Sequence, residues 1–124
     1  MTCMRGVRAS RAVEALTRRF RKAALRALHW SEQTAETLVQ RPIKQILLLH
    51  VGAFDALALG DLLSAYEERG VLFIPVQEAL GDPVYGIDPK VTGRGQENFL
   101  TQLLRATSRP RPRPPVPPEG CHTD

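Results

Sequence analysis

Apolar residues return every three or four positions along the first third of the chain, which is the spacing of one face of a helix. Most polar and charged residues of this stretch fall on the other side. Pro42 disfavours helical geometry at Arg41, so the pattern predicts one long amphipathic helix that ends near Gln40. The apolar positions are Val13, Leu16, Phe20, Ala23, Ala24, Ala27, Leu28, Ala35 and Leu38.

Two short apolar runs have the length and composition of strands, and the first predicts a strand buried on both faces. It is IKQILLLH, residues 43–50, which follows Pro42 and ends at His50. The second is VLFIPV, residues 71–76, where Pro75 marks the end of the strand or a place at a sheet edge. Residues 51–70 between them have helical spacing and close on Gly70, where a left-handed C-cap residue is expected. The order strand, helix, strand predicts an α/β fold with a parallel pair.

The rest of the chain divides by composition. Residues 77–80 predict a short helical turn, and residues 81–95 have the Gly, Asp and Pro content of a loop. Residues 96–107 return to helical spacing. Proline dominates residues 108–124, so this tail is expected to be disordered and extended. We therefore expect a mobile N-terminus of residues 1–11, a folded part of residues 12–107 and a Pro-rich tail of residues 108–124.

Charge is spread unevenly along the chain. Residues 1–26 hold eight Arg or Lys against the single Glu14, residues 27–108 are net acidic, and the tail adds Arg109, Arg111 and Arg113. A helix that covers a sheet explains the basic end more simply than a nucleic-acid or membrane surface does, so the sequence argues against a nucleic-acid partner. With 43% hydrophobic residues and no long apolar run, the sequence predicts a globular protein without a membrane span.

The N-terminal segment bears on targeting. Residues 1–16 lack the apolar core of a secretory signal, so no signal peptide is expected. The same segment is rich in Arg and poor in acidic residues, which is also typical of a mitochondrial presequence, so the compartment stays open. Cys3 and Cys121 have no partner at the spacing of a zinc site and predict no disulfide framework.

His50 is the candidate for proton chemistry. In parallel α/β architectures, catalytic groups gather at the carboxyl ends of strands, and the first expected strand ends on this histidine. Histidine has the side chain whose ordinary pKa lies nearest neutrality, so both protonation states are accessible. From the residues alone, a purely structural histidine at a strand end is the more common alternative.

The run Leu47-Leu48-Leu49-His50 is followed by further pieces in a specific order. These are the helix closing on Gly70, the strand of residues 72–76, and then Glu78-Ala79-Leu80, Asp82-Pro83 and Tyr85. Over residues 20–106 this succession resembles the C-terminal end of the polysaccharide deacetylase family, the NodB-homology carbohydrate esterases, in which a late barrel strand ends in a Leu-x-His motif. The specificity lies in the succession, because a leucine run before a histidine is a weak motif by itself.

The resemblance implies a fold and a chemistry. It implies the C-terminal strand-helix-strand portion of an incomplete (β/α) barrel, with a long N-terminal helix before it. Family members hold a divalent metal, usually zinc, and hydrolyse the acetyl groups of N- or O-acetylated glycans. By this resemblance His50 matches the general acid that protonates the leaving group, and Leu48 matches the leucine that lines the pocket for the acetyl methyl group.

Most of the family's motifs are missing from this sequence. It has no Thr-Phe-Asp-Asp strand, no His-x-x-x-His metal pair and no Arg-x-Pro segment. Phe54-Asp55 follows His50 and begins a helix, and neither His29 nor His122 replaces the missing pair. A catalytic zinc site needs three converging protein ligands. We therefore expect a fragment of a polysaccharide deacetylase that has no cofactor of its own and is inactive alone.

The tail offers a different class of function. Residues 111–117 fit the basic-x-x-Pro-x-x-Pro pattern of polyproline II ligands, whose extended form costs little entropy to dock. The alternative is thus a small interaction module that binds a polyproline-recognising partner through this tail. A third possibility is an electrostatic binder that uses residues 1–26, whose affinity for nucleic acid would depend strongly on salt.

Overall fold

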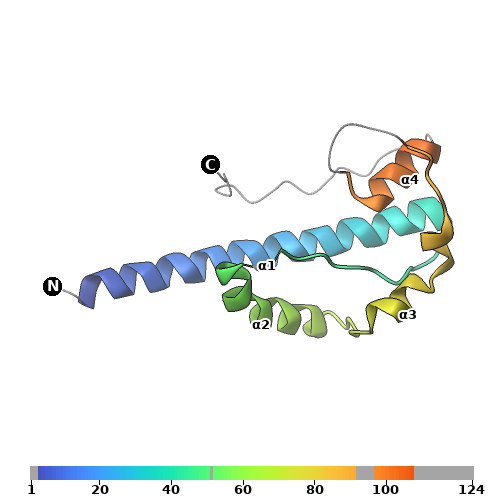
Figure 1. The fold of residues 1–124 in the computed structure, drawn as a ribbon. Coiled ribbons are helices and arrows are strands. Elements are labelled where there is room, and N and C mark those ends of the chain that lie inside the picture. The colour runs from blue at the N-terminus through green and yellow to red at the C-terminus, as the bar shows by residue number, and fades with distance from the viewer. Residues whose placement is uncertain (1–2, 51, 92–96, 108–124) are drawn as a thin grey trace. The chain divides into compact units, whose positions relative to one another are not determined.

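A computed structural model describes residues 3–50, 52–91 and 97–107, with side chains from Ser10 onward. Its elements are α1 (Cys3–Val39), α2 (Ala53–Glu68), α3 (Val76–Leu80), the 3₁₀ helix η1 (Pro83–Gly86) and α4 (Phe99–Thr107) (Figure 1). The three helices expected from helical spacing are confirmed by α1, α2 and α4, and the short helical turn expected at residues 77–80 is confirmed by α3. Helix α1 begins at Cys3, within the segment that the sequence assigned to a mobile N-terminus, and residues 108–124 lie outside the described part.

The expected α/β fold is wrong, because no strand forms among the residues that the structure describes. Residues 42–50 and 71–75 run without helix or ladder between their neighbouring helices. Their side chains are not buried as the strand prediction required: Leu48 is 84% exposed and Leu72 is 86% exposed. The two runs have the length and apolar composition of strands, but a strand also needs a hydrogen-bonded partner. An isolated pair of strands is only marginally stable in water.

The described residues fall into two compact units. Within the described part, unit 1 contains residues 3–26, 49–50 and 52–72, and unit 2 contains residues 27–48, 73–91 and 97–107. Helix α1 therefore contributes its first part to unit 1 and its last part to unit 2.

Unit 1 is formed by α2 packed on the first part of α1. The rings of Phe20 and Phe54 meet edge to face, with centroids 5.6 Å apart. At the other end of α2, the hydroxyl of Tyr66 donates to the backbone carbonyl of Ala24 at 3.1 Å. These contacts occur in the same order along both helices, so α2 runs in the direction of α1. The buried face of α2 has helical spacing and consists of Ala58, Leu62, Ala65 and Tyr66.

The end of α2 follows the expectation drawn from Gly70. This residue has φ +81°, the left-handed conformation that glycine adopts without a steric penalty. Its N–H donates to the carbonyl of Glu67 at 2.9 Å, and the N–H of Val71 donates to that of Tyr66 at 3.0 Å. The two bonds form a Schellman motif, which satisfies carbonyls at the helix end. At the start of α2, Asp55 lies in the first turn, but the N-cap is Gly52 and no side chain caps it.

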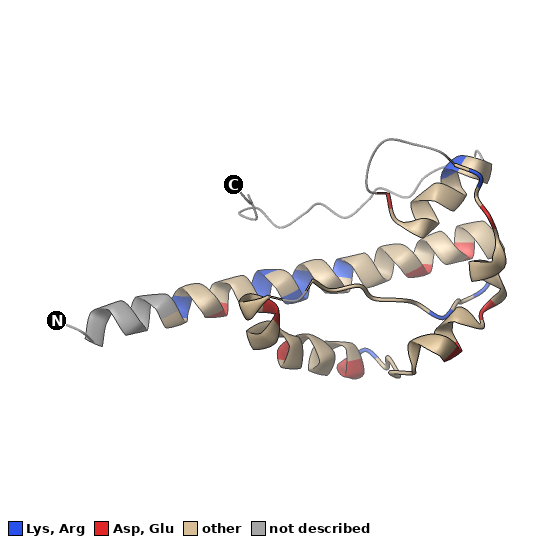
Figure 2. Cartoon of the chain, viewed as in Figure 1, with Lys and Arg blue, Asp and Glu red and all other residues tan. Residues whose placement is uncertain are grey.

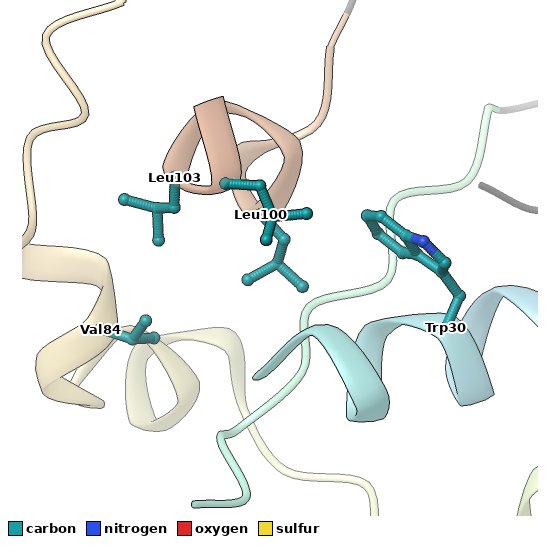
Figure 3. Packing of buried hydrophobic residues seen from close by; sticks show 5 residues of the cluster. Trp30, Val84, Leu100 and Leu103 are labelled. Carbon is teal, nitrogen blue, oxygen red and sulfur yellow. The ribbon is translucent and has the colours of Figure 1, made fainter. Parts of the chain in front are cut away.

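Unit 2 has its own hydrophobic core, in which α4 packs on the last part of α1 and on η1. Figure 3 shows Trp30, Val84, Leu100 and Leu103 pointing toward one another from these three elements. Leu104 completes the buried cluster and is 1% exposed. Partly buried side chains pack around it: Leu38, Val39, Ile43, Tyr85 and Phe99.

Candidate functional site

The two residues assigned by the resemblance lie in the irregular segment before α2. His50 is exposed, and Leu48 exposes 84% of its surface. The sequence placed both at the end of a buried strand, and that setting is absent from the described residues. Both side chains are instead accessible to solvent.

An extensively hydrogen-bonded carboxylate lies in unit 2, at Asp82. Its carboxylate accepts a bidentate pair of hydrogen bonds from the guanidinium of Arg41, at 2.6 and 3.1 Å. It also accepts the backbone N–H groups of Lys44 and Val84, each at 3.0 Å. Asp82 is only 7% exposed, so these four bonds replace the water that the carboxylate loses on burial. We call Asp82, Arg41 and the N–H groups of Lys44 and Val84 the Asp82 clamp.

The electrostatics of the clamp follow from its hydrogen bonds. The Arg41 guanidinium holds the pKa of Asp82 well below its usual range, and the N–H groups of Val84 and Lys44 act in the same direction against the effect of burial. The hydrogen bond to Asp82 in turn raises the pKa of Arg41. Asp82 is therefore ionised at neutral pH and serves as an acceptor, so it is not a proton donor.

Tyr85 forms a second link between the same two stretches of chain. Its hydroxyl donates to the backbone carbonyl of Lys44 at 2.5 Å, and its ring packs on Phe99 with centroids 5.5 Å apart. Burial raises the pKa of the Tyr85 hydroxyl, with a smaller contribution from the charge of Asp82. Together with the Asp82 clamp, this bond ties residues 41–44 to residues 82–85.

The sequence carried a partial signal for this arrangement. Asp followed by Pro is typical of an N-cap before the first helical position, and Asp82 caps η1 through Val84 in this way. The partner Arg41 lies 41 residues earlier, and no local pattern indicates that pairing. Asp82 and Tyr85 belong to the succession of residues that resembles the deacetylase family, but the resemblance implies no role for either of them.

The donor groups needed for the family's metal do not come together here. No three His, Cys, Asp or Glu side chains of the described residues lie close enough to hold a metal ion. His29 is exposed on α1, Asp55 lies in the first turn of α2, and His122 is outside the described part. The polyproline-like stretch of residues 111–117 also lies outside the described part, so its docking role stays a prediction.

Comparison of the chain with family models, with curated proteins and with solved structures finds no match. None of the helices within residues 3–50, 52–91 and 97–107 has the length and hydropathy of a membrane span.

Proposed function

We propose that this chain is a segment of a metal-dependent polysaccharide deacetylase, the class that removes acetyl groups from N- or O-acetylated glycans, and that it is inactive alone. The observation that carries the proposal is the ordered succession of Leu48-x-His50, a helix closing on Gly70, and Asp82-Pro83 with Tyr85. The sequence contains neither the Asp-Asp strand nor the His pair of the family. Activity therefore depends on a polypeptide that supplies them.

The contacts of Asp82 and Tyr85 support the proposal. Both are residues of the quoted succession, and both bind residues 41–44, which lead directly into the leucine run. They anchor the start of the segment that carries Leu48. A motif residue with a defined positioning contact is stronger support for ancestry than a match of letters alone.

His50 and Leu48 have distinct roles in this proposal. The amine of an N-acetyl sugar leaves poorly unless an acid donates a proton to its nitrogen as the C–N bond breaks. The exposed imidazole of His50 is the donor of that proton. Leu48, which is 84% exposed, offers an apolar surface to the acetyl methyl group.

Complementation with a second polypeptide tests the proposal. A polysaccharide deacetylase cut before its own Leu-x-His motif supplies the Asp-Asp strand and the His pair but lacks the acid. Co-expressed with this chain and given zinc, it is expected to release acetate from an N-acetylated chito-oligosaccharide. Neither polypeptide is expected to do so by itself.

A pair of matched variants assigns the activity to His50. His50→Gln is expected to abolish acetate release in the mixture, whereas His29→Gln, which changes an exposed histidine on α1, leaves the release unchanged. The two halves of the cut deacetylase serve as the positive control. If those halves complement each other but this chain does not replace the second half, the proposal is wrong.

A further inference from the structure

A row of cationic side chains follows one side of α1 in unit 1. Arg11, Arg18, Lys22 and Arg26 are all exposed, and at 3.6 residues per turn they fall within an arc of about 80°. We call these four residues the basic stripe. At 1.5 Å per residue, it extends for about 22 Å along the helix. Beyond Arg26 the exposed charges of α1 change sign, with Glu32 and Glu36 (Figure 2).

The cations of the stripe are not neutralised by the neighbouring helix. Asp61 of α2 pairs with Arg21, at 3.2 Å, and Arg21 lies outside the stripe. No acidic side chain in the described part of the chain forms an ion pair with Arg18, Lys22 or Arg26. An open hollow over this part of α1 is lined by Ala15, Leu25 and the cationic side chains of Arg18, Arg19, Arg21 and Lys22. Arg18 and Lys22 of the stripe therefore lie at this hollow without an ion pair among the described residues, and both are available to an anionic ligand.

The opposite side of α1 is partly covered by α2. Phe20 packs on Phe54, and the carbonyl of Ala24 accepts the hydroxyl of Tyr66. An amphipathic helix that binds a membrane buries its apolar face among the lipid chains. Here α2 covers part of that face, at Phe20 and Ala24, while Val13 and Leu16 remain 38% and 42% exposed. On the side of the basic stripe, α1 presents charge, with Ala15 and Leu25 as the apolar residues that line the same hollow.

We propose that the basic stripe binds the phosphate backbone of double-stranded nucleic acid without base preference. Arg18, Lys22 and Arg26 follow one another at intervals of about 6 Å along the helix, comparable to the separation of successive phosphates on one strand. The predominance of Arg favours phosphate, which guanidinium groups bind in a bidentate manner. The stripe contains no aromatic side chain on which unpaired bases could stack, which favours a duplex over a single strand.

This inference goes beyond the proposed deacetylase ancestry and does not depend on it. The sequence argued against nucleic acid because a helix covering a sheet explains the same amphipathic pattern. That explanation no longer holds, since no strand forms in the described part of unit 1 and the partner of α1 there is the single helix α2.

Fluorescence anisotropy of the full chain with a short labelled DNA duplex of arbitrary sequence tests the inference. The variant Arg18→Gln/Lys22→Gln/Arg26→Gln removes three exposed charges, and glutamine preserves the helix propensity. At about 50 mM salt, we expect its affinity to fall at least tenfold, and the slope of log K against log salt to become shallower by about 2.7. A second duplex of unrelated sequence is expected to bind the unaltered chain equally well.

The matched control is Arg109→Gln/Arg111→Gln/Arg113→Gln, which removes the same charge from the tail. It is expected to weaken binding less than threefold, and circular dichroism checks that both variants keep the helical signal. If the control loses as much affinity as the stripe variant, the tail is the binding element and the inference is wrong. Binding to vesicles rich in phosphatidylserine without binding to duplex DNA would also overturn it.

Discussion

Replacement of Asp82 by alanine is expected to destabilise unit 2 far more than replacement of an exposed aspartate would. The carboxylate accepts four hydrogen bonds while only 7% exposed. The guanidinium of Arg41 recovers water in the variant, because the side chain of Arg41 is 40% exposed. The N–H of Val84 does not, since Val84 is 1% exposed, and leaving such a donor unsatisfied costs about 1–3 kcal/mol. With the lost charge-assisted bonds, we expect a total of about 3 kcal/mol.

Urea unfolding followed by tryptophan fluorescence measures this change directly. Trp30 is the single tryptophan of the chain and is buried in the core of unit 2, so its emission reports on this unit. The matched control is Asp88→Ala, which removes one hydrogen bond, to the N–H of Lys90, at an exposed position. It is expected to cost about 0.5 kcal/mol or less. Equal free energies of unfolding for the two variants would show that the Asp82 clamp does not stabilise unit 2.

Three further predictions concern pH and packing. The pKa of Asp82 is depressed in the folded state, so its contribution to the free energy of unfolding is complete above about pH 4 and is lost as the pH falls further. In a plot of urea midpoint against pH, Asp82→Ala should therefore show a smaller decrease of the midpoint below about pH 4 than the unaltered chain does. Leu104→Ala is expected to lower the free energy of unfolding by about 3 kcal/mol, whereas Leu57→Ala at a 68% exposed position changes it by less than about 0.5 kcal/mol, as thermal unfolding checks. Thr34→Val should raise the free energy of unfolding by about 1 kcal/mol, because the fully buried Thr34 Oγ1 has no partner in the described structure. The change is measured as a higher urea midpoint, and an unchanged or lower midpoint would contradict it.

The parts of the fold that depend on near neighbours in sequence were predictable. Helical spacing gave α1, α2 and α4, and Gly70 gave the end of α2, because each of these features is decided within a few residues. The turn that follows α1 is a similar case. Pro42 disfavours a longer helix, and α1 ends at Val39, with Gln40 in the left-handed region at φ 53°.

The Asp82 clamp was not predictable, because it joins residues that are far apart in sequence. Arg41 and Asp82 are 41 positions apart, and the sequence gives no reason to prefer this pair over the other combinations of Arg and Asp. Only the capping role of Asp82 toward Val84 is local, and the Asp-Pro pair could have indicated it. The contribution of Tyr85 depends in the same way on a backbone carbonyl supplied by a remote residue, Lys44.

The wrong strand prediction has a related cause. A helix satisfies its own backbone hydrogen bonds and then needs one neighbour to cover its apolar stripe, so its pattern is nearly sufficient to predict it. A strand needs neighbouring strands as hydrogen-bonding partners and other elements that cover its faces. A local sequence pattern does not indicate whether those neighbouring strands are present. The leucine run before His50 and the run beginning at Leu72 have the composition of strands, and in the described structure they leave large apolar side chains in water. Exposed apolar runs of this kind are also the places where a chain is prone to associate with others. The error therefore falls on the two segments whose conformation depends most on partners that the sequence does not specify.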